Sequence, residues 1–288
     1  MNTKKIFPIS VMALLLASCD FSEDCIRYGN LITYPSFTKI EEAVVPLAET
    51  RHLIPYGKTV ESPYPEILTF TQDTLRWSAP QGDYDFIFYN GKNPVLNIGN
   101  INEVSLFSDT VRTDGRLYIK DKQEFVCFQQ FSEKLVYQKD VYKEFKPEPF
   151  TQTIVLRIHL YGNTYPVIGL QSELDGISLG KYLQSGDLHS LCGTIKSEYV
   201  ENTENNSTWV STNYVFGVNP QEKNNLRVTT ITSDTSAATY ELDLSQYLNN
   251  FKDYRITIDI DLTVGKGMEI NTPVNIEGWV DGSIVDIS

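Results

Sequence analysis

Side chains that could catalyse a reaction are scattered along this chain. Its three histidines are His52, His159 and His189, and their spacing matches no metal site and no charge-relay system. The chain contains no glycine-x-serine-x-glycine elbow, no P-loop and no dinucleotide fingerprint. Asp259 and Asp261 form a D-x-D pair that could bind calcium, but outward-facing strand charges also protect sheets against aggregation. We therefore expect no enzyme, no metal and no cofactor, and a secreted hydrolase has the least support.

The clearest chemistry lies near the N-terminus, at Cys19. Lys4 and Lys5 precede an apolar run over residues 6–16, whose eleven residues are fewer than the about 20 that a membrane span needs. The run has the form of a cleaved secretory signal. It ends in Leu16-Ala17-Ser18-Cys19, which resembles the lipobox of bacterial lipoproteins, in which the cysteine thiol takes a diacylglycerol and the new amine is acylated. We expect a signal peptide over residues 1–18 and a permanent lipid anchor, because several acyl chains hold far better than one.

An acidic run, Asp20-Phe21-Ser22-Glu23-Asp24, follows that cysteine. It resembles the tag that sends lipoproteins across the outer membrane in the Gram-negative phylum of gut and oral anaerobes. The alternative is a solvated acidic tether, since short charge runs are common in flexible segments. We expect residues 19–27 to form a lipidated tether and the mature protein to lie in the outer membrane, exposed at the surface.

Charge and cysteine content restrict the partners further. The chain of 288 residues has a net charge of −13, which repels nucleic acid and anionic lipid headgroups, so we expect neither as a partner of the surface as a whole. Of the four cysteines, Cys25, Cys127 and Cys192 remain beside the lipidated one, so at most one disulfide forms. Cys127 lies in an apolar strand, where a buried inert thiol is expected, although a bond to Cys25 stays open.

The elements around these residues are predicted to be strands. Apolar residues alternate with polar ones over 154–161 and 256–262, which is typical of half-buried strands. Leu244, Tyr247, Leu248 and Phe251 predict one short helix, because they share a helical face behind a capping-box arrangement at Asp243. The many short strands favour β-sandwiches. A stiff Pro-Glu-Pro stretch at 147–149 suggests a domain boundary there, giving domains over 28–147 and 148–288.

The three tryptophans are candidates for a glycan-binding platform. Trp77 and Trp279 lie in alternating strands and are expected to be core anchors. Trp209 borders the polar loop over 201–207 and is the candidate exposed aromatic residue, with a core position as the open alternative.

Several motifs, in their order along the chain, resemble the fimbrillin superfamily, and most closely the anchor or accessory subunits of type V pili. The motifs are Ala79-Pro80-Gln81-Gly82-Asp83-Tyr84 with Asn90-Gly91, Leu174-Asp175-Gly176-Ile177, the strand over 209–216, Leu242-Asp243-Leu244-Ser245-Gln246 and Gly278-Trp279.

The resemblance implies two tandem transthyretin-like β-sandwiches, hence an all-β fold with one short helix. In this family an arginine-specific protease removes the first strand of stalk subunits, whereas anchor subunits keep that strand and their lipid. It also implies contacts with other fimbrial subunits through strand edges. Arg27, Arg51 and Arg76 are the arginines near the first strands, and the segment over 274–287 is expected to donate or cover an edge.

Two functions follow from these observations. The first is a structural fimbrial anchor or accessory subunit in pilus assembly and cell adhesion. The second is a surface glycan-binding lipoprotein of a nutrient-uptake system.

Overall fold

The computed structural model describes most of the chain after residue 26. The predicted signal peptide, Cys19, Cys25, most of the tether and the tip of the 201–207 loop lie outside the described residues. No helix in the described part is long and apolar enough to cross a membrane. The described residues are 27–38, 40, 47–58, 65–120, 123–162, 166–202, 207–249, 251–264 and, for the backbone alone, 274–280 and 283–287.

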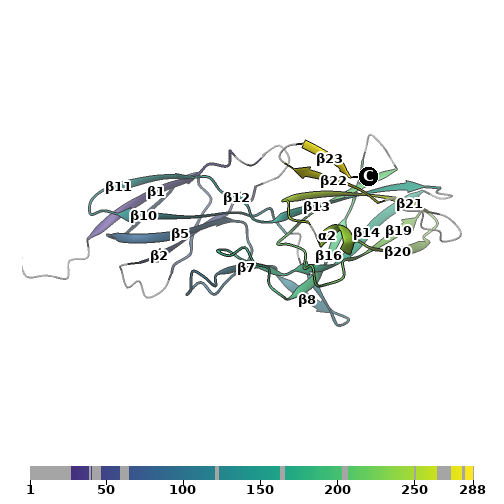
Figure 1. Cartoon of the computed structure of the whole chain (residues 1–288), viewed down its shortest axis with the longest axis horizontal. Coiled ribbons are helices and arrows are strands. Elements are labelled where there is room, and N and C mark those ends of the chain that lie inside the picture. The colour runs from purple at the N-terminus through teal and green to yellow at the C-terminus, as the bar shows by residue number, and fades with distance from the viewer. Residues whose placement is uncertain are drawn as a thin grey trace, which may run out of the picture.

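The first half folds into a sandwich of two sheets (Figure 1). Leu31, Leu53, Phe86 and Phe88 come from both sheets and are buried in one shared core. One sheet contains, in spatial order, β11 (Asp140–Phe145), β1 (Tyr28–Pro35) and β4 (Leu75–Pro80). The other contains β12 (Glu148–Pro149), β10 (Cys127–Leu135), β5 (Gly82–Asn90), β2 (Arg51–Gly57) and β3 (Leu68–Phe70).

The second half forms a larger sandwich of two six-stranded sheets. One sheet contains β17 (Val200–Glu201), β18 (Thr208–Val215), β13 (Gln152–Tyr161), β21 (Arg255–Thr263), β22 (Val274–Val280) and β23 (Ser283–Ile287). The other contains β20 (Ala237–Asp243), β19 (Asn225–Thr232), β14 (Val167–Ser178), β16 (Cys192–Glu198), β9 (Arg116–Ile119) and β8 (Thr110–Thr113).

The two strands with the strongest alternation lie side by side in this sandwich. β13 and β21 pair in parallel, with Ile154 opposite Ile256 and Leu160 opposite Leu262. This register places the apolar residues of both strands on one face, where they are buried. The predicted all-β fold and the two strands are therefore confirmed.

Strand pairing crosses the boundary expected at 147/148. A small sheet joins β6 (Val95–Leu96) and β7 (Ser105–Phe107) to β15 (Gly180–Tyr182). The hairpin β8–β9 extends a sheet of the second sandwich, because β9 pairs with β16. A third apolar core also contains residues of both halves, among them Tyr89 and Leu106 from the first and Leu183 and Phe216 from the second. The two sandwiches thus share a small sheet and an apolar core. The boundary at 147/148 itself stays a prediction.

The predicted helix is real but shorter than expected. α2 spans Ser245–Leu248, a single turn, with Leu244 and Leu248 buried. The N-cap is Leu244, which makes no side-chain cap bond, so the capping box expected at Asp243 is wrong. The Asp243 carboxylate instead accepts a hydrogen bond from the Ser245 backbone N–H at 2.9 Å. Tyr247 and Phe251 pack against the same core.

Candidate functional site

The first strand, β1, fills a slot in the middle of its sheet. It pairs in parallel with β11, from Asn30 opposite Asp140 to Pro35 opposite Phe145. It pairs antiparallel with β4 on its other side, with Leu31 opposite Trp77. Leu31 and Thr33 are fully buried. Removing β1 would leave two unpaired strand edges and an open core, which is a strand-shaped acceptor site.

Hydrogen bonds hold both ends of β1 in this slot. The Gln81 N–H donates to the carbonyl of Arg27 at 2.6 Å, before the strand begins. The Ser36 N–H donates to the carbonyl of Phe145 at 2.8 Å, after it ends. Within the strand, the Thr33 hydroxyl donates to the carbonyl of Lys143 at 3.0 Å. The first strand is therefore paired within its own chain.

Arginines near the slot lie in structured surroundings. Arg51 is in β2, whose backbone pairs with β3 on one side and β5 on the other. Its guanidinium donates to the carbonyl of Gln72 at 2.9 Å and pairs with Asp73 at 3.1 Å. Arg76 in β4 pairs with Asp140 at 3.1 Å. A protease needs an extended, unpaired segment, so Arg51 is a poor substrate in the folded chain.

The segment over 274–287 covers a strand edge within its own chain. β22 pairs antiparallel with β21, and β23 pairs antiparallel with β22. β23 is consequently the outermost strand of its sheet. Of the two roles expected for this segment, covering an edge is the one that the folded chain displays.

Trp209 lies in the core, which corrects its selection as the candidate exposed aromatic residue. Its exposed fraction is only 8%, and it packs in the core of the second sandwich. The cause is its register, because Trp209 stands directly opposite the fully buried Ile158 on β13 and so shares its face. Trp77 packs against the first core with its ring edge-on to Tyr84 and Phe86, as expected for a core anchor. The side chain of Trp279 lies outside the described residues.

His159, Asp259 and His52 make cross-strand contacts. His159 lies 2.9 Å from the hydroxyl of Thr208 and 3.2 Å from the carboxylate of Asp259, which also faces Arg157 at 3.5 Å. His52 stacks on Tyr89, and burial lowers the pKa of its ring, although a bond to the Gly91 carbonyl opposes this shift. In the described part of the chain, no three His, Cys, Asp or Glu side chains are arranged to hold a metal ion.

The described cysteines carry no disulfide. Cys127 and Cys192 are both free thiols, and Cys127 is fully buried. Burial raises the pKa of the Cys127 thiol to about 12, which makes the reactive thiolate scarce at neutral pH. The expected buried and inert thiol at this position is confirmed.

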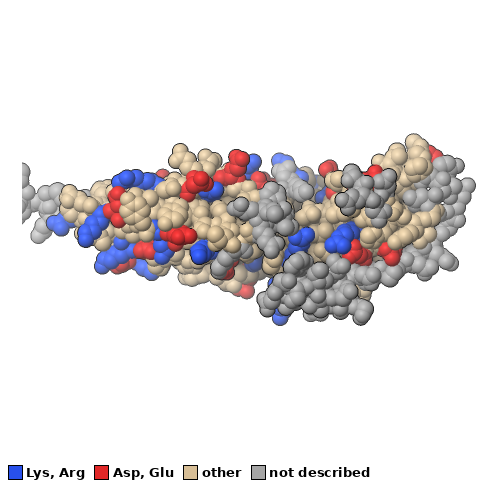
Figure 2. Space-filling model, turned by 90° about the horizontal axis from the view of Figure 1, so that it is seen from above, with Lys and Arg blue, Asp and Glu red and all other residues tan. Residues whose placement is uncertain are grey.

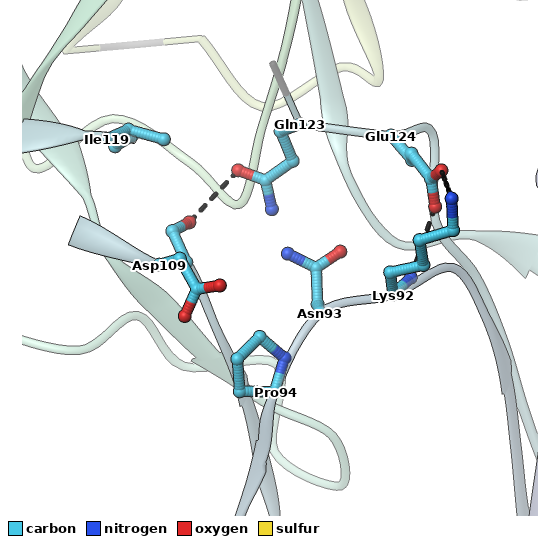
Figure 3. A pocket seen from close by; sticks show the side chains of 8 residues that line it. Lys92, Asn93, Pro94, Asp109, Ile119, Gln123 and Glu124 are labelled. Atoms are coloured by element: carbon cyan, nitrogen blue, oxygen red, sulfur yellow. Dashed lines mark hydrogen bonds and ion pairs between the residues drawn. The ribbon is translucent and has the colours of Figure 1, made fainter. Parts of the chain in front are cut away.

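A polar hollow of about 320 Å³ is lined by residues 92–94, 108–109 and 123–124 and by Ile119 at the end of β9 (Figure 3). Gln123 accepts a hydrogen bond from Ser108 at 3.1 Å, while its own side-chain NH₂ is buried without a partner. Asn93 and Asp109 lie around the same space. Amide and carboxylate groups of this kind bind hydroxyl groups of sugars. Sequence reasoning missed the hollow, because its residues come from segments whose spacing carries no signal.

Comparison with known proteins supports the fold. No family model matches the chain, and no curated protein matches it by sequence. A candidate adhesin from Bacteroides ovatus is similar over 93% of this chain and 99% of its own, with a TM-score of 0.58 and 12% identity. A candidate polysaccharide-binding protein from Bacteroides thetaiotaomicron is similar over 90% and 98%, with a TM-score of 0.56 and 10% identity.

The same comparison includes a fimbrial protein. The fimbrial anchor protein Mfa2 from Porphyromonas gingivalis is similar over 91% of this chain and 99% of its own, with a TM-score of 0.50 and 12% identity. The chain therefore has the β-sandwich fold of adhesins and fimbrial proteins. The expected resemblance to fimbrial anchor and accessory subunits is confirmed at the level of that fold.

Proposed function

We propose that this chain is a lipid-anchored accessory subunit that forms the cell-side end of a fimbrium. The observation that carries the proposal is β1, which is buried in its sheet, paired on both sides and held at both ends. A subunit whose slot is filled by its own strand cannot accept a strand from a neighbour. It can only end a polymer that grows by strand exchange.

The other end of such a subunit has to supply the contact with the fimbrium. The outermost strand of the β22–β23 hairpin presents an edge whose backbone groups can pair with a foreign strand. The proposal therefore assigns the filled slot to the cell side and the hairpin to the fimbrial partner. Cys19 supplies the lipid that fixes the chain in the outer membrane, and the mature protein performs no catalysis.

The test compares complemented deletion strains of the source bacterium. One strain expresses the full chain, one expresses Cys19→Ala and one expresses a chain that ends at residue 273. We expect surface fimbriae with the full chain, and fimbriae released into the medium with the other two. The released Cys19→Ala protein should keep the melting temperature of the mature chain, because the lipid lies outside both sandwiches.

Two results would contradict the proposal. Fimbriae of normal number, length and attachment in the deletion strain would exclude an anchoring role. A Cys19→Ala protein that stays in the membrane fraction would exclude the lipid anchor. Equal amounts of the three proteins, measured by immunoblot, are the control for expression.

Polysaccharide binding is the second candidate, and the hollow around Gln123 favours it. The hollow offers the buried amide of Gln123 beside the more exposed Asn93 and Asp109, whereas Trp209 is buried elsewhere and cannot contribute. Calorimetric titration with bacterial and plant polysaccharides tests this candidate. Binding that Gln123→Leu abolishes, and that the exposed control Gln81→Leu leaves unchanged, would support it. If none of the polysaccharides gives a heat of binding, polysaccharide binding is excluded.

A further inference from the structure

An exposed group of residues covers the end of the first sandwich that lies away from the second sandwich (Figure 1). β1 begins here and β10 ends here, and the turn between β10 and β11 is held because Gln138 N–H donates to the Tyr28 carbonyl at 3.0 Å. We call this group the tip. It consists of Arg27, Tyr28, Lys58, Lys134, Val136, Tyr137 and Lys139.

The tip exposes apolar and aromatic surface on a firmly held turn. The exposed fractions are 50% for Tyr28, 38% for Val136 and 43% for Tyr137. The guanidinium of Arg27 lies 5.6 Å from the centre of the Tyr137 ring. Tyrosine is enriched where a protein meets the boundary between water and a membrane, since its ring is apolar and its hydroxyl polar.

The tip is basic on a protein that is strongly acidic. Its four basic side chains contrast with the net charge of −13 for the whole chain, and Figure 2 shows several blue side chains around this end, with red ones among them. The nearest carboxylates include Asp85, which pairs with Lys58 at 2.7 Å, and Asp140, which pairs with Arg76 at 3.1 Å. Asp83 also lies beside the tip, opposite Lys134 in the sheet. Basic side chains near an anionic surface are attracted to it.

The short tether places the tip close to the membrane, an inference that rests on the proposed lipid anchor at Cys19. Seven residues lie between Cys19 and Arg27, so eight residue-to-residue steps join the two. An extended chain spans at most about 3.6 Å per residue, so the tip stays within about 30 Å of the membrane. We propose that the tip docks onto the phosphate headgroups of the outer membrane, with Tyr28, Val136 and Tyr137 at the interface.

Docking of the tip would fix the direction of the whole molecule. The tip and the second sandwich lie at opposite ends of the long axis (Figure 1). A docked tip therefore turns the second sandwich, with its β22–β23 hairpin, away from the membrane.

The test uses a tether that does not depend on natural lipidation. The chain from residue 20 carries an N-terminal histidine tag, Cys25→Ser and Cys192→Ser, and is bound to vesicles through a nickel-chelating lipid. The vesicles contain phosphatidylethanolamine, phosphatidylglycerol and a brominated lipid. An environment-sensitive fluorophore is attached at Tyr137→Cys, or at Val200→Cys, which lies on the second sandwich and is also exposed. Bromine quenches only a label that lies in the membrane interface.

We expect quenching at residue 137 to be at least twofold stronger than at residue 200. The double variant Tyr28→Ser and Val136→Ser should abolish this difference, whereas the exposed control Tyr254→Ser should preserve it. Equal quenching at both positions would overturn the proposal, and so would a difference that survives the double variant. Each labelled protein is first shown to float with the vesicles and to keep its melting temperature.

A polysaccharide is the competing occupant of the tip. The label at residue 137 is therefore also measured with soluble polysaccharides and no vesicles, and a spectral shift there would overturn the membrane assignment. The lipid anchor is tested separately, by measuring how much Cys19→Ala protein stays in the membrane fraction of cells. Protein that stays there would contradict the anchor but not the docking of the tip.

Discussion

Gly176 shows at the residue scale how one backbone position supports the second sandwich. Its φ is +80°, and the pairing of β14 with β16 shifts register between Leu174 and Ile177. A Cβ at this position would collide with the side-chain amide of Asn224. That amide donates to the carbonyl of Asp175 at 3.2 Å, so it cannot move away without losing its bond. The Asp175-Gly176 motif therefore has a structural basis.

Gly176→Ala should destabilise the protein by about 1–3 kcal/mol, through backbone strain and the displaced amide. Urea unfolding followed by fluorescence measures the change. Gly115→Ala is the matched control, because Gly115 also has a φ of +80° but has no atom within 4 Å of its Cβ position. We expect Gly115→Ala to lower the free energy of unfolding by less than Gly176→Ala does. If both variants lose the same amount, backbone strain alone explains the effect at Gly176.

Asp175 also carries a prediction for pH dependence. Burial alone would raise the pKa of its carboxyl group, but hydrogen bonds from Arg227 and Thr194 and the charge of Arg116 lower the pKa below its usual value. A lowered pKa in the folded state means that the ionised group stabilises the protein above pH about 4, where the unfolded group is also ionised. This contribution is lost as the pH falls through the folded-state pKa.

Asp175→Asn should therefore cost about 1.5–3 kcal/mol at pH 7, the range for a hydrogen bond to a charged group. The cost should shrink as the pH falls from 7 towards about 3, because the ionised carboxyl loses its stabilising contribution as the pH approaches the lowered folded-state pKa. Urea midpoints of wild type and variant at both pH values measure this. Glu201→Gln, at an exposed position, should change little at either pH. A cost at Asp175 that does not depend on pH would refute the argument.

At the scale of elements, the sequence predicts strands well where the pattern is local. The alternation over 154–161 and 256–262 gives β13 and β21 directly. β11 was missed, because its exposed residues include Tyr142 and its identity as a strand depends on β1, which is 110 residues away. Trp209 was misplaced for the same reason, since only its pairing with Ile158 decides which face it occupies. The hollow around Gln123 likewise depends on segments that meet only in the folded chain.

Because β1 fills its slot, we expect the folded chain to resist proteolysis after Arg51. An arginine-specific protease should cleave the folded chain slowly after Arg51, because the Arg51 backbone is paired with both Phe70 and Asn90. Arg112 in the exposed hairpin β8–β9 should be cut first and serves as the internal control. Mass spectrometry of a digestion time course measures both sites. Early release of a fragment that begins at His52 would show that the slot can be opened, which favours a stalk role over an anchor role.

At the scale of the whole molecule, the shared core should make the two sandwiches unfold together. Phe216 is fully buried, belongs to the core that both halves form, and lies edge-on to Phe150 with ring centres 6.0 Å apart. An apolar core that spans two domains couples their stabilities, whereas a polar contact would allow separate unfolding. Differential scanning calorimetry of the chain from residue 20 should therefore show one transition.

Phe216→Ala should cost about 3–5 kcal/mol by removing a large buried ring, and should split the transition into two. Leu248→Ala is the matched control, because Leu248 is equally buried but belongs to the core of the second sandwich alone. It should lower the melting temperature without splitting the transition. Two transitions in the unaltered chain would show that the β7–β15 pairing and the shared core do not couple the sandwiches. In that case a force along the long axis could unfold one sandwich while the other holds, whereas coupling makes the molecule resist force as one unit.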